Sequence, residues 1–114
     1  MSGMCAERTC PCMEPCPMKR AMDILGGKWK IPILCALWFD GPMRYNELNR
    51  RIHGISNTML ASSLKELERD GLIRREQFPE IPVRVEYSVT EECEKLVPAF
   101  EIIGAWSREK LEGA

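Results

Sequence analysis

Four of the six cysteines in this 114-residue chain, Cys5, Cys10, Cys12 and Cys16, lie within the first 16 positions. Thiols at this density can bind a metal ion, form disulfides, or react with oxidants and electrophiles. Their spacing differs from the paired C-x2-C knuckles of structural zinc sites, and the only histidine, His53, lies far away in the sequence. We therefore expect neither a bound metal nor a cofactor, and a four-cysteine metal site is the alternative.

The composition narrows the classes of protein to which the chain can belong. With 45% hydrophobic and 29% charged residues, it has the make-up of one globular domain. The longest strongly apolar run, IPILCALWF, is too short to cross a membrane, and the N-terminus lacks the apolar stretch of a secretory signal. We expect a cytoplasmic protein without a membrane partner, in which thiols stay mostly reduced.

No arrangement of residues points to catalysis. The single histidine has no cysteine near it in the sequence, and there is no glycine-rich phosphate loop or pair of carboxylates at a meaningful spacing. An enzyme is therefore not expected.

The first 39 residues predict an arm followed by two helices. Residues 1–15 contain many helix breakers and predict a flexible, cysteine-rich arm, with one folded domain over residues 16–114. PMKRAMDIL predicts a first helix with proline in its first turn, and KWKIPILCALWF a second helix that Lys28 opens. Trp29 and Trp38 lie on the apolar side of this second helix and are expected in the core.

The next two segments predict a pair of helices. MRYNELNRRIHG fits a short helix with Asn46 as its N-cap, and the longer helix after it is capped by Ser56 and ends before Gly71. The longer helix carries leucines on one arc. Its opposite arc begins with small hydroxyl and amide side chains, which let a helix N-terminus approach phosphates or base edges closely. An ordinary solvated face is the alternative.

The remaining segments predict a hairpin and a C-terminal helix. LIRREQF and VRVEYSVT each alternate apolar and polar residues and are joined by PEIP, as in an antiparallel hairpin. The last helix begins with Thr90 as its N-cap and kinks or restarts at Pro98. We expect its apolar stripe to be buried against a second copy of the chain, with packing back onto the first helix as the alternative; the stripe includes Leu96, Phe100, Ile103 and Trp106.

This order of elements is that of a winged helix-turn-helix protein. The residues themselves resemble the HxlR-type family of MarR-like bacterial transcriptional regulators, in the motifs GGKW, GPMRYNEL, LERDGLIRR and VRVEYSVT. The resemblance runs from Cys16 to about Trp106. It implies an α+β winged helix-turn-helix fold with a β-hairpin wing and additional N- and C-terminal dimerisation helices. It also implies a homodimer that binds an inverted repeat in double-stranded DNA.

Carried over to this chain, the resemblance makes residues 56–70 the recognition helix and the hairpin the wing. Because the net charge is −1, affinity for DNA depends on gathering basic side chains on one surface. The expected DNA contacts are Lys28, Arg44, Ser56, Asn57, Thr58, Met59, Ser62, Lys65, Arg75 and Arg84. A protein-interaction module with the same elements is the alternative in which these residues have no such role.

The resemblance also singles out Cys16, since many members have Cys-Pro at the start of the first helix and some sense oxidants or electrophiles through that thiol. A helix N-terminus near Lys19 and Arg20 favours the thiolate. We expect oxidation, or a thiol-reactive small molecule, to act at Cys16 and modulate DNA binding. The candidate resolving partners are Cys10, Cys12, Cys35 and Cys93.

Two alternatives to thiol sensing stay open. In the first, the thiols are inert, and Cys35 serves as a buried small hydrophobic residue. In the second, the same fold responds to a small ligand held between the core and the C-terminal helix.

Overall fold

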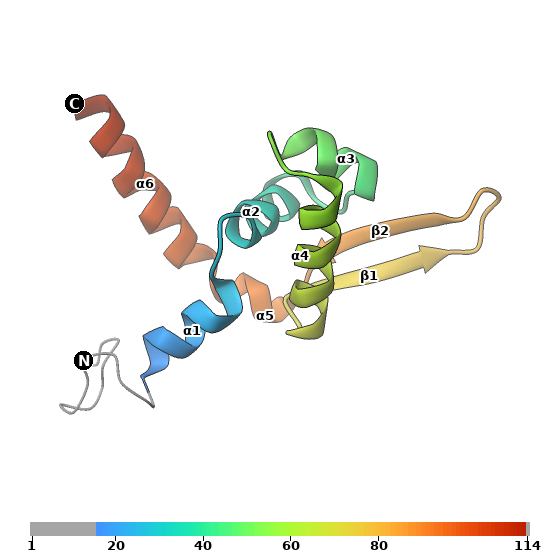
Figure 1. Ribbon diagram of the computed structural model, residues 1–114, viewed down its shortest axis with the longest axis horizontal. Helices are drawn as coiled ribbons and strands as arrows, with labels where there is room; N and C mark the ends of the chain where they lie inside the picture. The colour runs from blue at the N-terminus through green and yellow to red at the C-terminus, as the bar shows by residue number, and fades with distance from the viewer. Residues whose placement is uncertain (1–15, 114) are drawn as a thin grey trace.

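Residues 16–113 are described by the computed structural model, which builds them into six helices and one two-stranded sheet. Figure 1 shows α2, α3 and α4 gathered in one body, from which the hairpin and α6 extend in opposite directions. The predicted arm, with Cys5, Cys10 and Cys12, lies outside the described residues. In chain order the elements are α1 (Pro17–Leu25), α2 (Lys30–Asp40), α3 (Tyr45–Arg51), α4 (Asn57–Arg69), β1 (Ile73–Phe78), β2 (Arg84–Val89), α5 (Glu91–Glu94) and α6 (Val97–Gly113).

The core lies where α2, α3 and α4 meet the base of the hairpin. Burying one leucine or isoleucine side chain stabilises the fold by about 1.5–3 kcal/mol. Leucines from α4 contribute to this core, so their burial fixes which face of α4 is left outside. Large aliphatic side chains of the core with less than 2% of their surface exposed are Ile33, Leu34, Leu37, Leu48, Leu60 and Leu67.

The two tryptophans differ in burial. Trp29 packs against the core and is partly buried, in agreement with the prediction. Trp38 is 39% exposed, so the prediction that it lies in the core is wrong. The apolar pattern of α2 did not distinguish the burial of Trp29 from that of Trp38. The side of α2 that carries Trp38 lines a cavity beside α6 and does not meet another core element.

Both ends of α4 form as the local sequence predicts. The Ser56 hydroxyl oxygen accepts a hydrogen bond from the backbone N–H of Met59 at 3.1 Å, which confirms Ser56 as the N-cap. Gly71 follows the helix with φ +80°, a left-handed conformation in which a side chain would be strained. The recognition helix is therefore defined at each end by a residue suited to that position.

Two other helix starts differ from the prediction. The N-cap of α3 is Arg44 and not Asn46, because Glu47 accepts a hydrogen bond from the backbone N–H of Arg44 at 2.8 Å. The N-cap of α2 is Trp29, so Lys28 precedes that helix and does not open it. Both shifts are of one or two residues and leave the order of elements unchanged.

The hairpin is attached to the segment that precedes α3. β1 and β2 pair antiparallel with Ile73 opposite Val89, which confirms the predicted wing. Met43 and Tyr87 exchange two backbone hydrogen bonds, of 3.0 and 2.8 Å, and form an isolated bridge. The base of the wing is thereby fixed relative to the helix pair.

The C-terminal segment is two helices. Thr90 caps α5 as predicted, with its hydroxyl oxygen accepting from the backbone N–H of Cys93 at 3.4 Å. The same hydroxyl donates to the backbone carbonyl of Gly71 at 2.6 Å, which joins the two ends of the hairpin. The chain then restarts as α6 at Val97, with Pro98 in the first turn of the new helix, as the sequence indicated.

The apolar stripe of the C-terminal helix divides into two parts. Leu96 and Phe100 pack against the core, and this near end of α6 lies along α2. Ile103 and Trp106, farther along α6, are 56% and 59% exposed. Packing back onto the body therefore accounts for the first half of the stripe, whereas the second half lacks cover within the described residues.

Replacing Gly71 by alanine should lower the free energy of unfolding by about 1–2 kcal/mol, because alanine at φ +80° meets its own carbonyl oxygen. Gly104→Ala is the matched control. Gly104 lies inside α6, where a Cβ would meet only the end of the Arg108 side chain at 4.0 Å, so alanine should be neutral or stabilising. Urea denaturation followed by circular dichroism measures both. Equal effects would contradict the assignment of Gly71 as a required left-handed residue.

Candidate nucleic-acid interface

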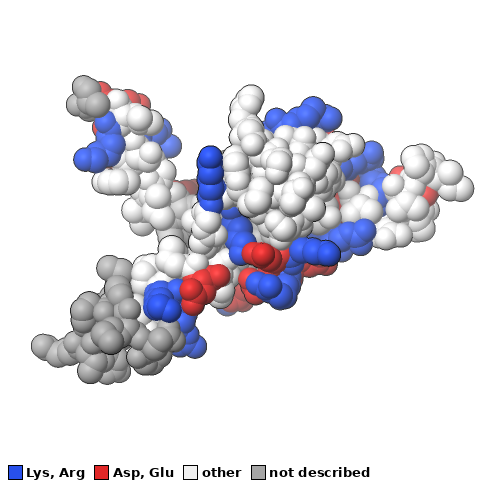
Figure 2. Space-filling model, in the orientation of Figure 1, with Lys and Arg blue, Asp and Glu red and all other residues white. Residues whose placement is uncertain are grey.

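The first two turns of α4 present a small, polar and uncharged surface. Thr58 and Ser62 are exposed in these turns beside Met59, Lys65 follows in the third turn, and the leucines of α4 are buried on the opposite face. The Ser62 hydroxyl donates to the backbone carbonyl of Met59 at 3.2 Å, so it lies close against the helix. Figure 2 shows this part of α4 as an uncharged area with Lys and Arg at its margins and with Asp and Glu toward the other end of the helix.

The start of α4 is held by α3 through two residues that the sequence analysis missed. The Tyr45 hydroxyl donates to the backbone carbonyl of Asn57 at 2.9 Å, and the Asn49 amide nitrogen donates to the Asn57 side-chain oxygen at 3.2 Å. The Asn57 amide nitrogen makes no hydrogen bond to the rest of residues 16–113 and can donate outward. Tyr45 and Asn49 share one face of α3, four residues apart, and this spacing was the available signal.

The arginines of the wing are not equivalent. Arg84 is held by two carboxylates, with N–O distances of 2.7 Å to Glu80 and 2.6 Å to Glu86, and its guanidinium lies 3.9 Å from the centre of the Phe78 ring. The hydrogen bonds that Arg84 donates to Glu80 and, second in effect, to Glu86 raise the pKa of Arg84 above its usual range. Arg84 therefore stabilises the wing, through a pairing that the alternation of the strand did not indicate, and its contact with DNA stays a prediction.

Three other basic residues of the predicted set are exposed. Arg44 lies at the start of α3, Lys28 lies before α2 with its ammonium 4.9 Å from the centre of the Trp29 ring, and Arg75 lies on β1. Within the described part of the chain, no carboxylate lies in ion-pair distance of these three side chains. Together with Lys65 on α4, which is also exposed, they are the basic groups that can meet phosphates.

The cysteines occupy three different environments. Cys16 is the N-cap residue of α1, where it was predicted, but its side chain is fully buried. Cys93 is also fully buried, and burial, followed by the nearby Cys35 thiol and Glu94, raises its pKa to about 11. Cys35 is half-buried and not enclosed in the core as the inert-thiol alternative supposed, and burial raises its pKa as well.

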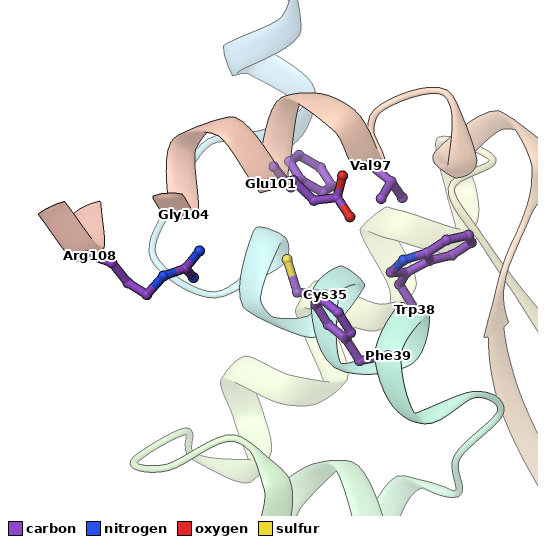
Figure 3. A pocket seen from close by; sticks show the side chains of 8 residues that line it. Cys35, Trp38, Phe39, Val97, Glu101, Gly104 and Arg108 are labelled. Carbon is purple, nitrogen blue, oxygen red and sulfur yellow. The ribbon is translucent and has the colours of Figure 1, made fainter. Parts of the chain in front are cut away.

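A cavity of about 400 Å³ separates α2 from α6. In Figure 3 the Cys35 sulfur points from α2 toward α6, and Glu101 and Arg108 reach into the same space from α6. The lining is mostly apolar and consists of Cys35, Trp38, Phe39, Val97, Phe100, Glu101, Gly104 and Arg108. Neither Glu101 nor Arg108 forms an ion pair within residues 16–113.

Comparison with known proteins assigns the family. The family model described as HxlR-like helix-turn-helix matches residues 24–114. The chain belongs to this family. An uncharacterized HTH-type transcriptional regulator of Methanothermobacter thermautotrophicus is 44% identical over 93 residues, covering 82% of this chain and 70% of the relative.

Solved structures agree with this assignment. A MarR-family transcriptional regulator from Porphyromonas gingivalis W83 superposes with a TM-score of 0.81 at 41% identity, covering 88% of this chain and 97% of that one. The redox regulator HypR in its oxidized form superposes with a TM-score of 0.77 at 37% identity, covering 82% of this chain and 96% of that one. The chain is thus an HTH-type transcriptional regulator with a winged-helix fold, and not an enzyme.

Two further findings bear on the sequence predictions. None of the helices in residues 16–113 is long and apolar enough to cross a membrane. Over the same residues, His, Cys, Asp and Glu form no group of three that could hold a metal ion. The four-cysteine metal alternative depends on Cys5, Cys10 and Cys12, which lie outside the described residues.

Alkylation should distinguish the two thiols that lie near each other. At about pH 8 the native protein should react with iodoacetamide at Cys35 and remain unmodified at Cys93, because Cys35 is partly exposed and Cys93 is buried with a pKa of about 11. Peptide mass spectrometry of timed samples measures both rates, and protein unfolded in guanidinium, where the two should react alike, is the control. Faster alkylation of Cys93 in the native protein would contradict the burial described above.

Proposed function

We propose that this regulator binds double-stranded DNA as a homodimer, with α4 in the major groove and the wing beside the phosphate backbone. The observation that carries the proposal is the shape of α4, which buries its leucines and turns a small, hydroxyl-rich and uncharged face outward. A helix N-terminus lined by Thr58 and Ser62 can approach base edges without steric or electrostatic opposition. Action on DNA also places the protein in the cytoplasm.

The proposed dimer uses the far half of α6. Its side chains are large, apolar and exposed, and a monomer would leave them in water. Two copies related by a two-fold axis would each offer one α4 to the same side of a duplex, which suits an inverted repeat. The exposed apolar residues of α6 are Ile102, Ile103, Trp106 and Leu111, and Leu96 and Phe100 support them from the core side.

Lys65→Ala and Arg75→Ala should each weaken operator binding, because each removes an exposed cation beside the proposed groove contact. Each variant should also reduce the slope of log affinity against log salt by about 1, the value for one lost phosphate contact. Fluorescence anisotropy at several salt concentrations, on a duplex that the wild-type protein selects from a random pool, gives both quantities.

Lys95→Ala is the matched control for these two variants. It removes the same charge from an exposed side chain that α5 and α6 flank, where its partner is Glu92. It should leave the affinity and the salt slope unchanged. A uniform loss in all three variants would indicate a general charge effect and contradict the proposed surface.

We further propose that modification of Cys16 regulates DNA binding. The similarity to HypR, a redox regulator, supports this role, as does the position of Cys16 at the N-terminus of α1. Because the Cys16 side chain is fully buried, added atoms cannot be accommodated unless the start of α1 moves. The resolving thiol is proposed among Cys10, Cys12, Cys35 and Cys93; burial and a pKa of about 11 leave little of the attacking thiolate at Cys93 near neutral pH.

A thiol oxidant should change the operator affinity of the wild-type protein and leave that of Cys16→Ser unchanged, because serine cannot be oxidised. Cys5→Ser is the matched control, since it removes one thiol that is in neither the sensing nor the resolving set. Anisotropy before and after oxidation, and again after reduction, gives the comparison. An equal response of Cys16→Ser and the wild-type protein would contradict a sensing role for Cys16.

A second candidate input is a small ligand in the cavity between α2 and α6. The observation that favours it is the combination of aromatic walls with Glu101 and Arg108, whose charges are not balanced by ion pairs in the described chain. Such a ligand would act on DNA binding through the position of α6. If an inducer acts equally on wild-type protein and Cys16→Ser but not on Gly104→Leu, which fills the cavity, this candidate replaces thiol sensing.

A further inference from the structure

Lys30, the first residue of α2, is a buried cation with partners on two other helices. Its side chain is 10% exposed. The ammonium donates to the backbone carbonyl of Ile24 near the end of α1 at 3.0 Å, and lies 2.7 Å from a carboxylate oxygen of Glu66 on α4. One side chain thus joins α1, α2 and the proposed recognition helix.

Burial of the Lys30 ammonium destabilises the fold unless both of its partners are present. A buried ammonium loses its hydration, and only close partners offset that loss. The carbonyl of Ile24 belongs to the last turn of α1 and has no partner within the helix. The hydrogen bond from Lys30 lowers the pKa of Glu66 below its usual range, which favours the Glu66 carboxylate. Glu66 is 45% exposed, and would be solvated without Lys30.

The helix α1 buries little of its own apolar surface. Within the helix only Leu25 is buried, and Met18, Met22 and Ile24 are exposed. Figure 1 shows α1 lying below α2, apart from the body that holds α3 and α4. The contact through Lys30 is a polar connection between the end of α1 and α4, in addition to the apolar packing of Leu25 in the shared core.

We propose that Lys30 is a positioning residue for operator recognition, which fixes the recognition helix by tying Glu66 of α4 to the end of α1. Lys30 itself does not reach DNA in this role, since its ammonium is buried among its partners. The placement of α4 then depends on the placement of α1. This inference rests on the proposed DNA binding.

The variant Glu66→Gln separates positioning from simple electrostatics. Removing a negative charge near DNA should by itself strengthen binding, because phosphate repulsion falls. If Lys30 and Glu66 position α4, the same change should instead weaken operator binding, on the order of fivefold. Glu68→Gln is the matched control: it removes the same charge from an exposed side chain on the same helix, and should leave operator affinity unchanged or increased.

The experiment measures binding of full-length protein to a duplex selected from a random pool by the wild-type protein, and to a scrambled duplex of the same composition. Lys30→Met should weaken operator binding on the order of tenfold and bind the scrambled duplex as the wild-type protein does. Lys30→Arg, which keeps the charge and the donors, should restore most of the affinity. The double variant Lys30→Met with Glu66→Gln should lose no more than Lys30→Met alone.

Several outcomes decide the matter. Operator binding within twofold of wild type in both Lys30→Met and Glu66→Gln would overturn the inference, as would tighter binding by Glu66→Gln. If Lys30→Met fails to fold by circular dichroism, Glu66→Gln with its Glu68→Gln control still decides the question. A wild-type protein that selects no duplex at all would overturn the proposed function itself, a result distinct from equal binding by the variants.

Discussion

The orientation of α4 about its own axis is the constraint on which the rest of the structure depends. Leu60, Leu64 and Leu67 are each at most 2% exposed, and burial of each contributes about 1.5–3 kcal/mol. Turning the helix by one residue, roughly 100°, would expose these leucines and bury the hydroxyl face. The hydrophobic core therefore determines which side chains can face DNA, although none of the core residues touches it.

Polar contacts around α4 add to the hydrophobic core in fixing the position of this helix. Tyr45 and Asn49 hold its first turn to α3, and Lys30 holds its last turn to α1 and α2. The bridge between Met43 and the wing then fixes the hairpin against the same helix pair. Recognition helix and wing are thus parts of one unit, so a duplex would meet both in a fixed geometry.

Local signals in the sequence predicted most of the fold. Ser56, Gly71 and Thr90 are end signals whose effect is contained within a few residues, and the alternation in the two strands has a similarly short range. Two features that the sequence did not predict depend on partners distant along the chain. The burial of Lys30 requires a carboxylate 36 positions later, and the exposure of Trp38 depends on the direction in which α6 leaves the body.

In the candidate site, too, some features were predictable from the sequence and others were not. The exposed face of α4 was predictable from helical spacing, because burial of its leucines leaves the opposite arc outside. The engagement of Arg84 by Glu80 and Glu86 was not, since the turn between the strands decides whether these side chains meet. The burial of Cys16 likewise differs from an accessible thiol at a helix start, and makes movement of α1 part of any reaction there.

Dimethyl sulfate footprinting, which methylates guanine N7 in the major groove and adenine N3 in the minor groove, tests the central claim most directly on a duplex that the protein has selected. That claim is that two copies place two α4 helices in successive major grooves. The account predicts two protected stretches, related by symmetry, with centres about 10–11 base pairs apart or a multiple of that distance. One uninterrupted or unsymmetrical protected stretch, or protection confined to the minor groove, would contradict it.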